Sequence, residues 1–136
     1  MKNLIKIIEL SDMPIFMPDG TRLSARVWRP ENAETVPVPA ILEFLPYRKR
    51  DGTTARDCLT PPYIAKRGYA CIRVDMRGNG ESQGIMEDEY TEQELCDAEA
   101  TIIWLAAQPW CSGTVGMMGI SWGGFNALQV AARQPA

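Results

Sequence analysis

A serine flanked by glycines is the strongest chemical signal in this sequence. The stretch Gly119-Ile120-Ser121-Trp122-Gly123 has the pattern Gly-x-Ser-x-Gly. It joins an apolar segment, Val115–Ile120, to an Ala-rich helical segment, Phe125–Arg133. Where a strand turns sharply into a helix, the serine stands at the apex, and glycine is needed beside it because a Cβ would clash in so tight a turn. We therefore predict that Ser121 is a nucleophile near a helix N-terminus.

A serine hydroxyl needs a general base to become a nucleophile, and the usual base is a histidine oriented by a carboxylate. The sequence contains no histidine. In α/β-hydrolases the chain order is Ser, then Asp or Glu, then His. Two interpretations remain: the chain is the N-terminal part of a longer protein, or it is an inactive remnant. We favour the first, because the chain stops at Gln134–Ala136, directly after the helix that follows the serine.

The elements that must position this serine follow from hydrophobic patterning. Around the turn Pro18-Asp19-Gly20 we expect an antiparallel β hairpin, with Leu23, Ala25 and Val27 on its buried face. Further strands are expected over Ala40–Leu45, Tyr69–Val74 and Val115–Ile120. Helices are expected at three places: ending over Tyr63–Arg67 before Gly68, from a capping box at Thr91 to Pro109, and over Phe125–Arg133 with Leu128, Ala131 and Ala132 on one side.

This order of elements is a β hairpin followed by strand, helix, strand, helix, strand and helix. Strands that alternate with helices favour right-handed crossovers and a mostly parallel sheet, and continuously apolar strands suit a sheet that is covered on both faces. We predict an α/β fold in a single domain, residues 1–136: the N-terminal part of an α/β-hydrolase core, whose C-terminal strands are missing.

Composition narrows the classes of partner. Apolar residues make up 46% and charged residues 23% of the 136 residues, which excludes disordered, collagen-like and coiled-coil chains. The net charge of −3 argues against a nucleic-acid partner. Lys6 and Glu9 interrupt any apolar leader, and no apolar run is long enough to span a membrane. We expect a cytoplasmic protein without a membrane segment; its oligomeric state is open.

No cofactor or metal is expected. The four cysteines, which form no Cys-x-x-Cys pair, are interpreted as reduced thiols, with Cys71 packed as a small hydrophobic residue. The glycines of Gly78-Asn79-Gly80 do not complete a dinucleotide fingerprint, because Gln83 occupies the third glycine position.

For three groups of charged residues, a structural role competes with a functional one. Asp75 and Arg77 are interpreted as residues that fix a loop by hydrogen bonds rather than as catalytic groups. Arg48-Lys49-Arg50 is interpreted as a source of loop-anchoring ion pairs, Asp51 being one candidate partner. Glu87-Asp88-Glu89 could pair with a substrate amine or act as glycosidase carboxylates, but a solvated acidic loop is the default interpretation.

Four segments together resemble the X-Pro dipeptidyl-peptidase and cocaine-esterase family of α/β-hydrolases. They carry the resemblance jointly, over nearly the whole chain after residue 12. The segments are Asp19-Gly20-Thr21-Arg22-Leu23, Leu45-Pro46-Tyr47-Arg48, Arg73–Ser82 and Gly116–Gly124.

The resemblance implies hydrolysis of an ester or amide through a serine nucleophile, with a small-molecule ester or a short peptide or amide as substrate. Ser121 matches the nucleophile, and the backbone N–H of Trp122 matches one oxyanion-hole donor. Tyr47 matches the tyrosine whose hydroxyl is the second donor; taken without the resemblance, it would be a packing residue. The family's Asp and His, its helical cap and its C-terminal β-sandwich have no counterpart here.

Two rival functions stay open. The chain could be an inactive, truncated hydrolase-like module that acts through protein interaction, because a sheet cut off near its fifth strand leaves an edge that can pair with another chain. The same elbow also supports other acyl or lyase chemistry.

Overall fold

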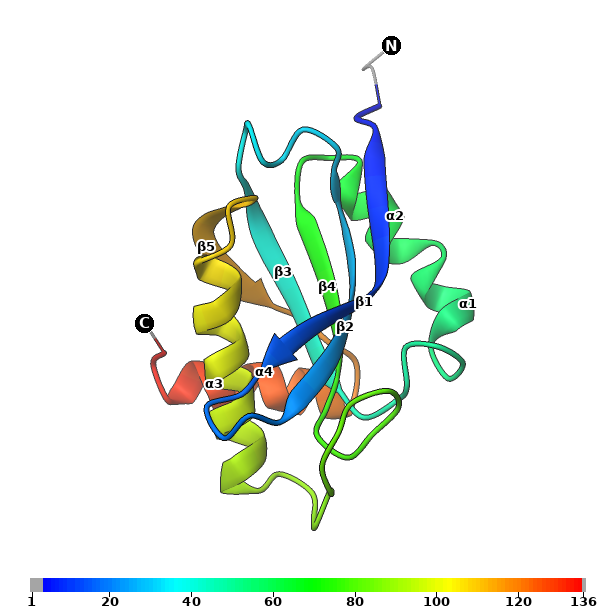
Figure 1. Ribbon diagram of the computed structural model, residues 1–136. Helices are drawn as coiled ribbons and strands as arrows, with labels where there is room; N and C mark the ends of the chain where they lie inside the picture. Colours follow the sequence, from blue (N-terminus) through cyan, green and yellow to red (C-terminus); the bar gives the residue numbers. More distant parts are fainter. Residues whose placement is uncertain (1–3, 136) are drawn as a thin grey trace.

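The computed structural model describes residues 4–135, and its centre is a five-stranded mixed sheet with the order β1-β2-β4-β3-β5 (Figure 1). The strands are β1 (Ile7–Phe16), β2 (Arg22–Pro30), β3 (Val38–Leu45), β4 (Ala70–Asp75) and β5 (Cys111–Met117). The pairings β1–β2 and β2–β4 are antiparallel, whereas β4–β3 and β3–β5 are parallel. The predicted α/β fold and the N-terminal hairpin are confirmed, and the hairpin accounts for both antiparallel pairings.

Four helices connect or follow these strands: α1 (Thr54–Asp57), α2 (Thr60–Ala65), α3 (Glu92–Ala106) and α4 (Trp122–Ala132). Helix α2 packs on β2 and β4, where Trp28, Ala65 and Cys71 form a small buried cluster. In Figure 1, helices α3 and α4 lie toward the left and bottom of the sheet, near the hairpin turn, whereas α1 and α2 lie on the right. The sheet is therefore covered on both faces over β4 and β3, as its continuously apolar strands require.

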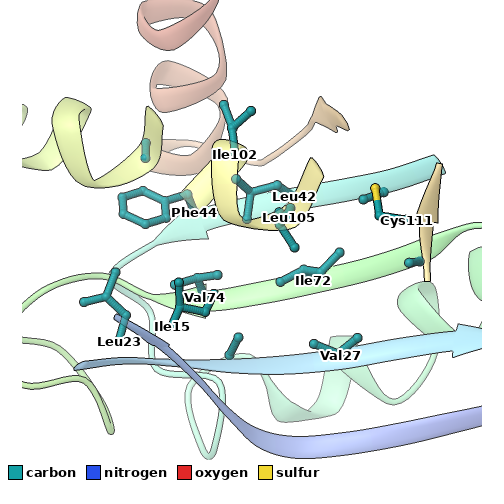
Figure 2. Packing of buried hydrophobic residues seen from close by; sticks show 14 of the residues in the cluster. Ile15, Leu23, Val27, Leu42, Phe44, Ile72, Val74, Ile102, Leu105 and Cys111 are labelled. Atoms are coloured by element: carbon teal, nitrogen blue, oxygen red, sulfur yellow. The ribbon is translucent and has the colours of Figure 1, made fainter. Parts of the chain in front are cut away.

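The main core lies between the sheet and helices α3 and α4. Alternate residues of β3 and β4, Leu42 and Phe44 with Ile72 and Val74, point to this face, and Ile102 and Leu105 of α3 pack onto them (Figure 2). All six side chains are buried. Intervening positions of the same strands, such as Glu43 and Arg73, face the α1 and α2 side because successive strand residues alternate.

The structure corrects the predicted boundaries around the serine. The expected strand Val115–Ile120 is displaced: β5 begins at Cys111 and ends at Met117, and α4 begins at Trp122 rather than at Phe125. Polar residues 112–114 belong to β5 but lie at an irregularity in its pairing with β3, between the pairs Val38↔Cys111 and Ala40↔Val115. Residues 118–121 form the turn, since the backbone of Ser121 cannot continue a strand.

The expected apolar face of the last helix is also corrected. The buried residues of α4 are Gly123, Asn126 and Val130, whereas Leu128 is 72% exposed. The i, i+3, i+7 spacing of the buried set points it at β3, and Leu128 lies off that stripe. Helix α1 was not predicted. No helix within residues 4–135 is long and apolar enough to cross a membrane.

Candidate active site

Ser121 stands at the turn between β5 and α4 in a backbone conformation that is unusual for serine. Its φ is 55° and its ψ is −117°. A non-glycine residue held at positive φ costs about 1–3 kcal/mol, and such residues cluster at functional sites. The side chain makes no capping hydrogen bond to α4, and the residue is exposed. The structure therefore presents the Ser121 hydroxyl outward from a strained turn, as expected for a nucleophile elbow.

Close backbone packing explains the glycines of this turn. A Cβ on Gly119 would lie 2.6 Å from the Cα and O atoms of Gly123, and a Cβ on Gly123 would lie 3.0 Å from Leu45 Cδ2. The atoms that a Cβ on Gly119 would meet belong to the backbone of Gly123, so helix α4 itself would have to move. The predicted steric need for glycine beside the serine is confirmed.

Tyr47 lies beside this turn although it is distant in the sequence. It follows the carboxyl end of β3, and its hydroxyl oxygen accepts a hydrogen bond of 3.2 Å from the backbone N–H of Trp122. Trp122 is the first residue of α4, so its N–H has no acceptor one turn earlier in the helix. The structure brings together the two groups expected to bind an oxyanion, and their catalytic roles stay predictions.

The loop that carries Tyr47 is anchored by the carboxylate of Asp75. One oxygen of Asp75 accepts the backbone N–H of Lys49 at 2.8 Å, and the other accepts the backbone N–H of Glu81 at 3.0 Å. Burial raises the pKa of Asp75, and the two backbone N–H groups work against that shift. These contacts confirm that Asp75 fixes loops.

Charged side chains reinforce the same loops. The buried Lys49 ammonium pairs with Glu81 and donates to the carbonyl of Ser11 at 3.1 Å. Arg48 pairs with Asp51, as expected. The predicted structural role of the basic triplet is therefore confirmed.

Arg77 ties three separate segments together. Its guanidinium bonds Asp97 of α3 at 2.7 Å and Asp19 of the hairpin turn at 2.8 Å. Hydrogen bonds to Asp97 and then Asp19 raise the pKa of Arg77, and the Arg77 hydrogen bond lowers the pKa of Asp19. Arg77 is thus a structural group, as the sequence analysis predicted.

An aromatic cluster beside Ser121 was missed from the sequence. The ring of Tyr90 lies 4.8 Å from that of Trp122 and 5.7 Å from that of Phe125. Trp122 and Phe125 both come from the first turns of α4, so the cluster flanks Ser121. Aromatic residues at positions one and four after the serine were the available signal, since that spacing puts them on neighbouring turns.

Glu94 holds this cluster by its carboxylate. One oxygen accepts the indole N–H of Trp122 at 2.6 Å, and the other accepts the backbone N–H of Tyr90 at 2.8 Å. The predicted cap at Thr91 is present, since its hydroxyl accepts the backbone N–H of Glu94 at 3.2 Å. Glu94, however, reaches back to Tyr90 and not to the cap residue, which corrects the predicted capping box.

The acidic loop directly precedes Tyr90, whose ring packs against Trp122. Glu87, Asp88 and Glu89 are exposed, which confirms a solvated loop. Glu87 and Asp88 line a cavity of about 590 Å³ together with Phe44 and Met76, and Ser121 is not part of its lining.

All four cysteines are free thiols in the structure. Cys58 and Cys96 are exposed, whereas Cys71 and Cys111 are buried. Burial raises the pKa of the Cys71 thiol to about 12. No cluster of His, Cys, Asp and Glu that could hold a metal occurs within residues 4–135.

The chain is similar to proteins that are described as peptidases, esterases and hydrolases. The family model described as X-Pro dipeptidyl-peptidase (S15 family) matches residues 19–136. Cocaine esterase from Rhodococcus sp. (strain MB1 Bresler) is 34% identical over 125 residues, which cover 89% of this chain and 21% of the esterase. A putative Xaa-Pro dipeptidyl-peptidase from Bacillus anthracis is 28% identical over 136 residues, covering 76% of this chain and 22% of that protein.

A solved structure agrees in fold. The crystal structure of a CocE/NonD family hydrolase from Staphylococcus aureus matches with a TM-score of 0.82 and 24% identity, over 95% of this chain and 26% of that chain. The chain thus spans about a fifth to a quarter of the length of these relatives.

Proposed function

The chain belongs to the X-Pro dipeptidyl-peptidase (S15) family, and we propose from that premise that it supplies the nucleophile and the oxyanion hole of a serine hydrolase. Its relatives are named as esterases and dipeptidyl-peptidases. The proposed substrate class is a small-molecule ester or a short peptide or amide.

The reaction is acyl transfer in two steps. Ser121 Oγ attacks the acyl carbon while a general base removes the hydroxyl proton, and the carbonyl oxygen becomes an oxyanion. The Trp122 N–H and the Tyr47 hydroxyl donate hydrogen bonds to that oxyanion. Collapse of the intermediate expels the alcohol or amine, which takes the proton, and leaves an acyl-serine. Water then attacks the acyl-serine, releases the acid and restores the Ser121 hydroxyl.

The general base in this proposal comes from outside residues 1–136. The sequence contains no histidine, and a chain that carries an Asp and a His at later strand ends would complete the triad order Ser, Asp, His. We propose that residues 1–136 alone are inactive in triad chemistry, apart from the slow reaction that an oxyanion hole alone supports.

One observation supports this proposal most strongly. Ser121 is held at a φ of 55° directly before Trp122, whose N–H is 3.2 Å from the Tyr47 hydroxyl oxygen. A turn that only connected a strand to a helix would gain nothing from strain at this residue. When substrate enters, the carbonyl oxygen replaces the weak Trp122–Tyr47 hydrogen bond and receives a bond from each donor.

The test is covalent labelling by a fluorophosphonate probe. The longer protein that contains these residues should be labelled rapidly at Ser121, and its Ser121→Ala variant should be neither labelled nor active toward esters. Residues 1–136 alone should be labelled negligibly. Rapid labelling of the isolated chain would contradict the proposal about the base, and ester hydrolysis by the Ser121→Ala variant would contradict the nucleophile.

The same experiment separates the rival hypothesis of an interaction module. A longer protein that folds but is not labelled at Ser121, while binding a protein partner through this segment, would favour that hypothesis over hydrolysis.

A further inference from the structure

We propose that Glu94 is a positioning residue for the oxyanion hole: its carboxylate holds the Trp122 indole and thereby fixes the backbone N–H of Trp122 beside Ser121. This inference rests on the proposed function. It extends that function to a residue on another helix, which does not touch the reacting atoms.

The contacts of Glu94 converge on the residue after the nucleophile. Its two carboxylate oxygens are each occupied, one by the Trp122 indole N–H at 2.6 Å and the other by the Tyr90 backbone N–H at 2.8 Å. Glu94 is only 6% exposed, so water competes little for these bonds. Hydrogen bonds to an ionised carboxylate are about twice as strong as neutral ones.

The bond from Glu94 to Tyr90 supports the bond from Glu94 to Trp122. Tyr90 has a φ of 53°, which is unusual for a tyrosine, and Glu94 bonds to the backbone N–H of that same residue. Its ring then packs 4.8 Å from the indole that Glu94 also holds. One carboxylate therefore fixes the indole at its N–H and fixes the aromatic ring packed against it.

Trp122 needs such an anchor because of its place in α4. As the first helical residue, its N–H is not bonded within the helix, and Ser121 provides no side-chain cap. The direction of that N–H depends on the orientation of the residue that carries it. An indole fixed to α3 restrains this residue from the side, while the Tyr47 hydroxyl meets its N–H from the end of β3.

A purely local role does not explain this arrangement. A glutamate that only completed a capping box would reach back to the backbone N–H of Thr91. Glu94 instead joins α3 to the start of α4, across 28 residues of sequence.

The test uses active-site kinetics in the longer protein that contains these residues. Sites are counted by fluorophosphonate labelling, so that kcat refers to folded enzyme only. Glu94→Ala removes both acceptors and should lower kcat about 100-fold with little change in KM, the cost of a displacement near 1 Å at a reacting group. Glu94→Gln keeps one acceptor oxygen and should lose less. Thr91→Val is the matched control, because it weakens the same end of α3 without touching Trp122, and it should leave kcat unchanged.

A spectroscopic readout accompanies the kinetics. The indole N–H resonance of Trp122, identified by its loss in Trp122→Phe, should shift in Glu94→Gln and stay in place in Thr91→Val. In a double-mutant cycle, Glu94→Gln should lower kcat much less in the Trp122→Phe background than in the parent protein, because its main target is already gone.

The outcomes separate the two proposals. If Ser121→Ala abolishes activity but kcat per labelled site is unchanged in both Glu94 variants, the hydrolase stands and the role of Glu94 is overturned. Full additivity in the double-mutant cycle also overturns it. If Ser121→Ala remains active, the proposed function fails, and the inference about Glu94 fails with it.

Discussion

Replacing Gly119 by alanine should push helix α4 away from the end of strand β5. A Cβ at this position would lie 2.6 Å from the Cα and O atoms of Gly123, whereas ordinary contacts begin near 3.4 Å. The two backbone segments would have to separate by more than about 0.8 Å, because the carbonyl carbon of Gly123 would lie closer still and neither segment has a side chain there that could turn aside. That movement also loosens the packing of Gly123 against Leu45.

The expected cost follows from this overlap. Overpacking a close contact typically costs 1–3 kcal/mol, and a backbone contact belongs at the upper end, so we expect about 3 kcal/mol of lost stability. With a urea m-value of about 2 kcal/mol per M, the unfolding midpoint should fall by about 1.5 M. Tryptophan fluorescence is a suitable probe, because Trp122 lies in α4 and Trp28 and Trp110 are buried.

Gly116→Ala is the matched control for this prediction. Gly116 lies in the same strand, and a Cβ there would meet no atom within 4 Å. Its alanine variant should be neutral or more stable by about 0.4–1 kcal/mol, because alanine reduces the freedom of the unfolded chain. Equal midpoints for the two variants would refute the packing argument. In the longer protein that contains these residues, the rate at which a fluorophosphonate labels Ser121 should also fall about 100-fold in Gly119→Ala but not in Gly116→Ala.

Three further predictions concern the hydroxyl of Tyr47, the pH dependence of stability and the thiols. Tyr47→Phe should lower kcat about 100-fold in the longer protein, as loss of one oxyanion donor does, with stability changed by less than about 1 kcal/mol because the bond it loses is neutral and exposed. The hydrogen bond from Arg77 lowers the pKa of Asp19 below its usual 3.8, so this stabilisation is present above pH 3.8 and is lost as the pH falls. Acid unfolding followed by circular dichroism should therefore depend less steeply on pH in Asp19→Asn; an unchanged profile would show that the pair does not contribute. A thiol reagent at pH 8 should modify Cys58 in the folded protein and reach Cys71 only on unfolding, because burial raises the Cys71 pKa to about 12; modification of Cys71 before Cys58, detected by peptide mass spectrometry, would contradict this argument.

The sequence predicted those elements whose signals are local. The strands β3 and β4 are mostly apolar runs, and the cap at Thr91 is a short-range pattern, so both were found near their observed positions. The start of β5 was missed because residues 112–114 are polar and flexible by composition. They lie between the pairs Val38↔Cys111 and Ala40↔Val115, so the pairing of their neighbours with β3 extends the strand across them, and composition does not encode that pairing.

The residues of the candidate site also fall into those with a local signal in the sequence and those without one. Ser121 and Trp122 are adjacent in the sequence and form one motif, so they were found together. Tyr47 is separated from Trp122 by 75 residues, and only the family resemblance pointed to it. Glu94 was missed because a local pattern already explained it as a capping residue, and nothing in the spacing shows that its carboxylate reaches α4.

The oxyanion hole proposed here depends on anchors from both sides of the sheet. The loop that carries Tyr47 is held by Asp75, which accepts the backbone N–H of Lys49. Asp75 shares a face of β4 with Cys71 and Arg73, on the α2 side, because alternate strand residues point the same way. Trp122 is held by Glu94 of α3, which covers the opposite side. Because β3 and β5 are parallel, their carboxyl ends lie at one edge, and that is where the two donors meet. Neither donor could hold its place alone, since Tyr47 begins a loop after β3 and Trp122 begins a helix without a side-chain cap. The preorganisation on which such a site depends is therefore built from buried carboxylates outside the catalytic motif.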